Sequence, residues 1–269
     1  MKNFPKPFSL KTYFLVVIAL SWPFQIAYVL WAKTPFMRYA LSFLPMIMVA
    51  VATYIAGRYI FRDGFSTAGW NWGKSKHYLA VFLLAIFVWV VPTIVELVLG
   101  MRSISKGVIF PEILENFMLR FVATLIPAFG EEFGWRGYLL PHLIKRYRLK
   151  TALLLHSFIW WAWHLPVIVS MGVAENPTGN RGTSIAIMLA ITLIPSMMHA
   201  IAYAYIWTVT QSLAVVTVYH AAFDEIRDAI EVSIGLSPLV QVWQMLTLTI
   251  LGGLLLWKGN WKQLTVRKT

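Results

Sequence analysis

The sequence predicts an all-α membrane protein, a polytopic helical bundle with about eight transmembrane helices. Of its 269 residues, 59% are hydrophobic and 13% are charged, and the mean hydropathy is +0.67. Soluble domains carry about twice that share of charged residues. The apolar residues also come in long blocks, and a block of about 18 or more reads as a membrane span. These observations exclude one large soluble core.

Eight segments of the chain are long and apolar enough to be candidate spans. The first follows three lysines, but its apolar run is longer than that of a signal peptide and no small-x-small cleavage site follows it, so it is interpreted as a span. The spans after residue 110 are less uniformly apolar than the first three. In chain order, the candidates are residues 12–32, 39–61, 78–100, 116–141, 151–171, 184–206, 209–232 and 239–257.

The distribution of Lys and Arg predicts the orientation of the bundle. Segments 2–11, 58–76, 145–150 and 258–268 would lie on one side of the membrane and hold fifteen of these residues, against six on the other side. Because basic loops remain in the cytoplasm, both termini are expected to be cytoplasmic.

Composition also limits the function classes. The chain has no cysteine, which excludes thiolate catalysis, disulfides and cysteine-based metal sites. The net charge of +12 is compatible with nucleic acid, but the basic residues lie between apolar blocks and no basic–aromatic module is visible. The lipid bilayer is therefore the expected partner, and nucleic acid is not.

The chain is expected to form a single membrane domain over residues 1–269. Residues 12–110 read as scaffold helices, because they carry almost no ionisable side chains within their spans. Residues 116–232 hold many such side chains, and 239–257 is a last helix. An ionisable residue at the centre of a span costs about 2.5–3.5 kcal/mol, so each one in 116–232 needs a partner or a task.

Depth brings three of these side chains together. Glu131 lies ten residues before the end of its span, and His164 and His220 lie thirteen and eleven residues after the starts of theirs. At about 1.5 Å per residue, all three lie roughly 15–20 Å from the cytoplasmic ends of their helices. A carboxylate and two imidazoles are thus expected to meet around one cavity within the bundle.

Helical spacing predicts which side chains pair. Residues four apart share a face, so His220 should lie beside Asp224, and Glu132 beside Arg136. The adjacent Glu131 should point about 100° away from Glu132, which allows the two carboxylates different roles. Pro166 is expected to kink the helix near the predicted cavity.

The same residues form three motifs that resemble a known family. Glu131-Glu132-Phe133-Gly134-Trp135-Arg136 is similar to the EExxxR motif of CPBP membrane proteins, which include type II CAAX prenyl proteases and Abi-like, bacteriocin-processing peptidases. The segment from Trp160 to His164 resembles their second motif, with Trp160 where Phe is usual. The segment from His220 to Asp224 resembles their third motif, HxxxN, with Asp in the last place.

The resemblance implies a glutamate-dependent intramembrane endopeptidase whose substrate is a peptide or membrane-associated protein, possibly lipidated. It implies that Glu131 and His164 activate a water, that His220 and Asp224 form the oxyanion hole, and that Glu132, Arg136 and Trp160 support them. No cofactor is implied. An ionised Asp224 would repel an oxyanion, so this residue must either be protonated to donate or orient His220.

Three other functions fit the same residues. His164, His220 and a carboxylate would suffice for a zinc-dependent membrane protease, although the HExxH spacing is absent. A non-catalytic immunity or scaffold protein would keep the motifs as relics. A transporter would use the buried acids and histidines as a proton relay. The remaining histidines are expected to be structural, because the sequence shows no partner for them: His77, His142, His156 and His199.

Overall fold

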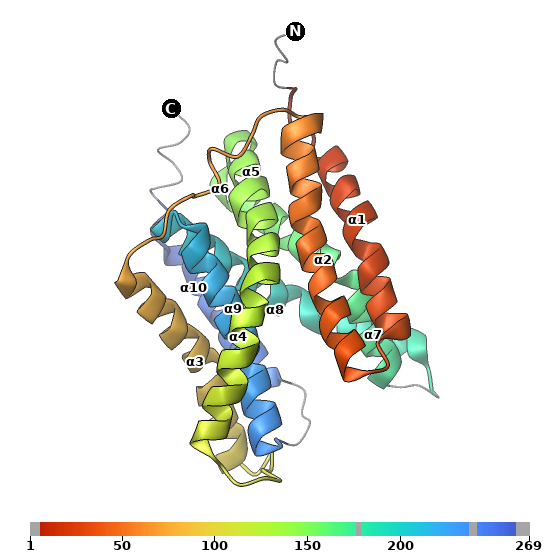
Figure 1. The fold of residues 1–269 in the computed structure, drawn as a ribbon, viewed down its shortest axis with the longest axis vertical. Coiled ribbons are helices and arrows are strands. Elements are labelled where there is room, and N and C mark those ends of the chain that lie inside the picture. The colour runs from red at the N-terminus through yellow and green to blue at the C-terminus, as the bar shows by residue number, and fades with distance from the viewer. Residues whose placement is uncertain (1–5, 176–178, 237–240, 262–269) are drawn as a thin grey trace.

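The computed structural model describes residues 6–175, 179–236 and 241–261. Within these ranges the chain is a helical bundle without a strand, apart from one isolated bridge between Ile104 and Leu236. The all-α membrane architecture predicted from the sequence is therefore confirmed. Figure 1 shows long helices that run up and down the long axis of the molecule and are joined mostly by short connections.

The helices follow one another as α1 Leu10–Trp31, α2 Pro35–Ile55, the π-helix η1 Ala56–Ile60, α3 Ser75–Val98, α4 Phe110–Glu132, the π-helix η2 Phe133–Leu139, α5 Leu140–Arg146, α6 Leu149–Trp163, α7 Leu165–Glu175, α8 Arg181–Thr210, α9 Leu213–Ile234 and α10 Val242–Lys258. Every predicted span coincides with one of these helices or with a consecutive group of them. Helix α10 begins three residues after the predicted start of the last span (239–257), and 239 and 240 lie outside the described residues.

The predicted number of eight spans is higher than the described helices support. Five of them are long and apolar enough to cross a membrane, and a sixth crossing is reached if the bent pair α6–α7 counts as one span. Helices α9 and α10 are not among these crossings, because α9 carries five acidic and arginine side chains and α10 has only 17 residues. The protein is an integral, multi-pass membrane protein, and its described residues include five or six such apolar helices.

Several helices begin at a residue whose side chain caps the first turn. Ser9, Thr34, Asn180 and Ser212 each accept a hydrogen bond from the backbone N–H three residues further on. Such caps pair N–H groups that have no partner inside the helix. Local sequence therefore fixes where α1, α2, α8 and α9 start.

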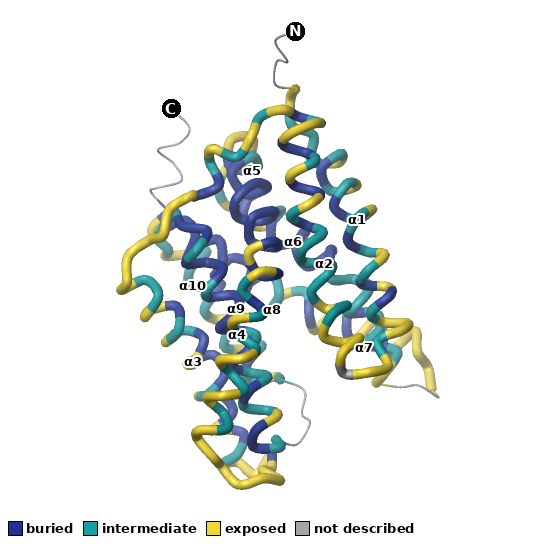
Figure 2. Tube along the Cα trace, viewed as in Figure 1, coloured by how far each residue is buried: buried dark blue, intermediate teal, exposed yellow. Residues whose placement is uncertain are grey.

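Burial is uneven along the bundle. The largest side chains that are fully buried gather in η2, α5, α8 and α9, whereas the first three long helices present many apolar side chains outward (Figure 2). In a membrane protein those outward side chains contact lipid rather than water. Helix α4 packs against both α9 and α2, and this contact brings the motif-bearing helices together.

The described parts of the predicted basic segments lie together at one end of the bundle, called here the basic end. At this end the loop 61–74 connects α2 and α3, the chain turns from α5 into α6, and α8 turns into α9 (Figure 1). The backbone N–H of Leu213 donates to the carbonyl of Gly69, and that of Lys6 to the carbonyl of Phe61, which ties these segments to one another. Four basic residues used in the orientation argument lie outside the described residues: Lys2, Lys262, Arg267 and Lys268.

Candidate active site

The two motif glutamates lie at the end of α4, where two glycines let this helix approach α2 closely. A Cβ atom at Gly130 would lie 2.9 Å from the carbonyl oxygen of Met46, and one at Gly134 would lie 2.3 Å from the side chain of Val49. The carbonyl of Gly134 also accepts a hydrogen bond from the Tyr13 hydroxyl at 3.0 Å. Immediately after Glu132 the helix widens into the π-helix η2, a geometry found frequently at functional sites.

Glu132 is the anchor of a fully buried polar group. Its Oε1 accepts a hydrogen bond from Arg136 Nη1 at 2.9 Å and lies 2.8 Å from His220 Nδ1. Both Glu132 and Arg136 are 0% exposed. The predicted Glu132–Arg136 pair is present, and the contact with His220 was not predicted. Because a carboxylate only accepts, Nδ1 of His220 carries a proton directed at Glu132.

Arg136 is held by aromatic rings as well as by the carboxylate. Its guanidinium carbon lies 4.2 Å from the centre of the Tyr203 ring and 5.3 Å from that of Trp160. A cation over such ring faces is stabilised most where water is excluded. The buried charge of Arg136 is thus neutralised by Glu132 and enclosed by two rings that also line the cavity.

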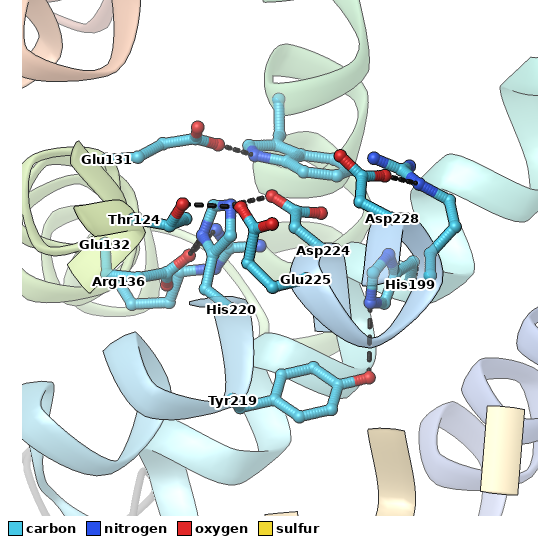
Figure 3. A network of polar contacts seen from close by, with 12 residues as sticks. Thr124, Glu131, Glu132, Arg136, His199, Tyr219, His220, Asp224, Glu225 and Asp228 are labelled. Atoms are coloured by element: carbon cyan, nitrogen blue, oxygen red, sulfur yellow. Dashed lines mark hydrogen bonds and ion pairs between the residues drawn. The ribbon is translucent and has the colours of Figure 1, made fainter. Parts of the chain in front are cut away.

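Glu131 points away from Glu132 (Figure 3). Its Oε1 accepts a hydrogen bond from the indole Nε1 of Trp160 at 2.6 Å. Glu131 is 2% exposed and borders an internal cavity. The predicted separation of the two glutamates is therefore observed: one joins the buried pair with Arg136, and the other faces open space.

His164 lies at the break between α6 and α7, which meet at an angle of 55°. Its Nδ1 is 2.8 Å from the carbonyl oxygen of Trp160, which can only accept, so Nδ1 carries the proton and Nε2 of the neutral ring is an acceptor. The ring packs between Trp160 and Trp163, each 4.6 Å away. Pro166, in the first turn of α7, accounts for the bend, as predicted.

His220 and Asp224 share one face of α9, as their spacing predicts. Nε2 of His220 is 3.4 Å from Oδ2 of Asp224, and the Asp224 side chain is 31% exposed. That separation is long for a hydrogen bond between these atoms. His220 is consequently oriented mainly by Glu132, and Asp224 lies beside it at the edge of the cavity.

One cavity of about 290 Å³ collects these groups. The residues that the sequence singled out and that line it are Glu131, Trp160, His164, His220 and Asp224. Glu132 and Arg136 lie behind it, in the buried layer next to His220. Among the residues that the structure describes, no group of three or more His, Asp or Glu side chains is arranged to hold a metal ion.

The sequence reasoning missed two residues of the cavity wall, His199 and Tyr203 on α8. His199 Nε2 lies 3.2 Å from the Tyr219 hydroxyl, and its ring centre lies 4.5 Å from that of Tyr203. The spacing of four residues between His199 and Tyr203 was the available signal, since it places both on one face of a helix.

Two of the other histidines also have partners that the sequence did not reveal. His142 contacts Asp63 at 2.7 Å, from α5 to the loop 61–74. His77 accepts a hydrogen bond from the backbone N–H of Lys74 at 3.3 Å. Both lie outside the cavity, and His156 is fully buried behind it.

Fold and site together define a polytopic helical membrane protein with an internal cavity lined by carboxylate and imidazole side chains. Comparison with known proteins finds a family that is similar to part of the chain. Residues 113–226 match the model of the type II CAAX prenyl endopeptidase Rce1-like family, so this part of the chain is similar to that family. The matched range contains every motif residue from Glu131 to Asp224.

One protein with a similar sequence is the CAAX prenyl protease 2 of Methanococcus maripaludis. The chain is 31% identical to it over 71 residues, which make up 26% of each of the two proteins. The chain thus matches about a quarter of the length of this relative.

Proposed function

We propose that this protein is an intramembrane endopeptidase that hydrolyses a peptide bond in a peptide or membrane-associated protein. The match of residues 113–226 to the Rce1-like endopeptidase family supports a membrane protease. The observation that carries the proposal is the convergence of Glu131, His164 and His220, from three different helices, on one cavity. Peptide hydrolysis needs an activated nucleophile and a stabilised oxyanion, and these side chains offer an acceptor for each water proton and a donor for the oxyanion.

In the proposed reaction, Glu131 takes a proton from a water molecule that also donates to Nε2 of His164. The oxygen of this water forms a bond to the carbonyl carbon, and the electron pair of the C=O bond moves to the carbonyl oxygen. The C–N bond then breaks, and the proton held by Glu131 passes to the departing nitrogen. Trp160 keeps the Glu131 carboxylate in place through its indole N–H. No step requires a cofactor.

His220 is the proposed donor to the oxyanion. Its Nδ1–H is already directed at Glu132, so the ring offers Nε2 toward the cavity. When both nitrogens carry protons, the imidazolium is stabilised by Glu132 on one side and by Asp224 on the other. A positively charged donor is well suited to developing negative charge.

The name of the archaeal relative suggests a first substrate to test, a peptide with a C-terminal prenylated cysteine motif. We propose such a lipidated peptide, within a cellular membrane and with both termini of the enzyme in the cytoplasm, as the starting assay. A peptide without the prenyl group is the matched comparison.

The test is product formation by membranes that contain wild type, Glu131→Ala or Glu112→Ala protein at equal folded levels. Glu112 is a suitable control because it lies on the same helix as Glu131 and does not line the cavity. Peptide products identified by mass spectrometry should appear with wild type and Glu112→Ala and fall by roughly 10²–10⁴-fold with Glu131→Ala. Identical product profiles for all three would contradict the proposal, and loss of products on metal chelation would favour a zinc enzyme.

The Asp224→Asn variant is expected to keep or raise the activity. His220 is held by Glu132 at 2.8 Å, whereas Asp224 lies 3.4 Å from the ring, so orienting His220 does not depend on Asp224. An amide adds an N–H donor and removes a charge that would repel the oxyanion. The measurement is kcat on the peptide used above; a folded Asp224→Asn protein with kcat reduced more than about tenfold would show that the carboxylate is required.

A further inference from the structure

A second, larger cavity adjoins the site cavity. It has a volume of about 720 Å³ and lies between the first half of α2, the first half of α4 and the second half of α9. The two cavities share four lining residues: Tyr28, Ser42, Met46 and Asp224. Because they share these residues, the larger cavity directly adjoins the space that Glu131 and His164 face. It is called the antechamber below.

Six charged side chains line the antechamber, from three helices: Arg38, Arg120, Asp224, Glu225, Arg227 and Asp228. Some pair with one another: Arg227 Nε donates to Asp228 at 2.6 Å, and Arg120 lies 3.9 Å from the same carboxylate. The positive and negative groups are equal in number. Charged side chains inside a membrane protein face water-filled cavities or each other, because contact with hydrocarbon is costly. The antechamber is therefore suited to water and to a hydrophilic chain, and a lipid tail would not replace the hydration of these groups.

The opposite side of the site is closed. Between Glu131 and the basic end lie the residues of η2 and α5, and their largest side chains are 0–1% exposed: Trp135, Tyr138, Leu139, Leu140 and Leu143. This dense layer is the dark region around α5 in Figure 2. A further cavity of about 510 Å³ near the loop 61–74 shares no lining residue with the site cavity. This dense layer of η2 and α5 separates the site cavity from the basic end.

The antechamber lies toward the end opposite to the basic end. Arg38 is in the first turn of α2, just after the α1–α2 connection, and Arg120 and Asp228 lie in the halves of α4 and α9 nearest the loops 99–109 and 235–236. In Figure 1 these connections lie at the bottom, and the loop 61–74 lies at the top.

We infer that the antechamber is the hydrated approach to the active site, and that a hydrophilic segment of the peptide substrate enters through it from the end opposite to the basic loops. The approach route stands on the cavities alone; the identity of its occupant rests on the proposed function. The substrate class that follows is a peptide with polar or charged residues beside the bond that is cut. Any apolar or lipidated part of it would lie outside the antechamber.

The chain has no cysteine, so single cysteines report accessibility without background. Ser42→Cys is the test variant, because Ser42 lines both cavities. Ser103→Cys, in the loop 99–109, marks the face next to the antechamber, and Lys76→Cys marks the basic end. Ile126→Cys is the lipid control, since Ile126 is on α4 and 72% exposed on the outer surface of a membrane helix. A membrane-impermeant, positively charged methanethiosulfonate reacts with thiolates, which form in water and not in lipid.

In right-side-out and inverted membrane vesicles, Ser42→Cys should react from the same face as Ser103→Cys. Its rate should be at least about tenfold higher than that of Ile126→Cys. Reaction from the face that labels Lys76→Cys, or a rate no higher than that of Ile126→Cys, would overturn the proposed route. This result needs no enzymatic activity, so it is independent of the proposed function.

The occupant is tested with the same variants and the peptide of the product assay. Labelling should reduce hydrolysis by Ser42→Cys protein at least tenfold and leave hydrolysis by Ser103→Cys protein unchanged. Undiminished hydrolysis by fully labelled Ser42→Cys protein would show that the peptide does not use the antechamber. Absence of Glu131-dependent products in unlabelled protein would instead refute the proposed function and leave the labelling result intact.

Discussion

Replacing His164 with alanine is expected to lower kcat by roughly 10²–10⁴-fold, the range for loss of a positioned proton-transfer group. The Nδ1 proton of His164 is fixed by the carbonyl of Trp160, so only Nε2 is left to accept from a water molecule. The ring is half-buried at a helix break and makes no hydrogen bond to another helix, so the bundle should fold without it. A loss of kcat with little change in KM would match a group that acts on water rather than on substrate binding.

The control for this variant is His77→Ala. His77 is a half-buried histidine in the first turn of α3, at the basic end and outside the cavity. Both variants should elute as monodisperse protein in detergent and have similar thermal stability. If His164→Ala kept more than about a third of the wild-type kcat on a Glu131-dependent substrate, His164 would have no part in activating the water.

Arg136→Met is expected to cause the largest loss of stability. It removes the guanidinium and leaves the Glu132 carboxylate fully buried beside His220. Breaking a buried ion pair by removing one partner costs about 3–5 kcal/mol, and here the contacts with the Tyr203 and Trp160 rings are lost as well. Thermal unfolding in detergent should therefore occur at a clearly lower temperature than in wild type.

Two comparisons distinguish the effect on stability of an unpaired buried charge from the effect of losing a long side chain. Arg146→Met removes an exposed arginine at the end of α5 and should change the free energy of unfolding by about 0.5 kcal/mol or less. The double variant Glu132→Gln with Arg136→Met removes the unpaired charge and should recover part of the lost stability. Equal stability of Arg136→Met and Arg146→Met protein would mean that the Glu132–Arg136 pair does not stabilise the fold.

The sequence was most informative where a charged residue interrupts an apolar helix. Glu131, His164, His220 and Asp224 were singled out from their depth and spacing, and the structure brings them around one cavity. The predicted spans also coincide with described helices or helix groups, although five or six of them, rather than eight, pass as apolar crossings. Both results rest on local regularities, since the rise along a helix and its period fix depth and face.

Contacts between helices were not accessible in the same way. The bond between Glu132 and His220 joins residues 88 positions apart, and no sequence spacing reports how α4 and α9 are rotated against each other. The pairing of His142 with Asp63 and the position of His199 in the cavity wall were missed for the same reason. These features depend on tertiary packing, which a single sequence constrains only weakly.

The π-helix η2 changes how the residues on either side of it are related. Its i→i+5 hydrogen bonds enclose one residue more than the turns of an α-helix, which displaces everything after it by about 100° around the helix axis. Glu131, before η2, can therefore face the cavity while Tyr138 and His142 reach Asp63 in the loop 61–74. It follows that residue spacing across 133–139 cannot be read with a single helical period. A deletion of one residue there would regularise the helix and yet turn one of these two groups away from its partners.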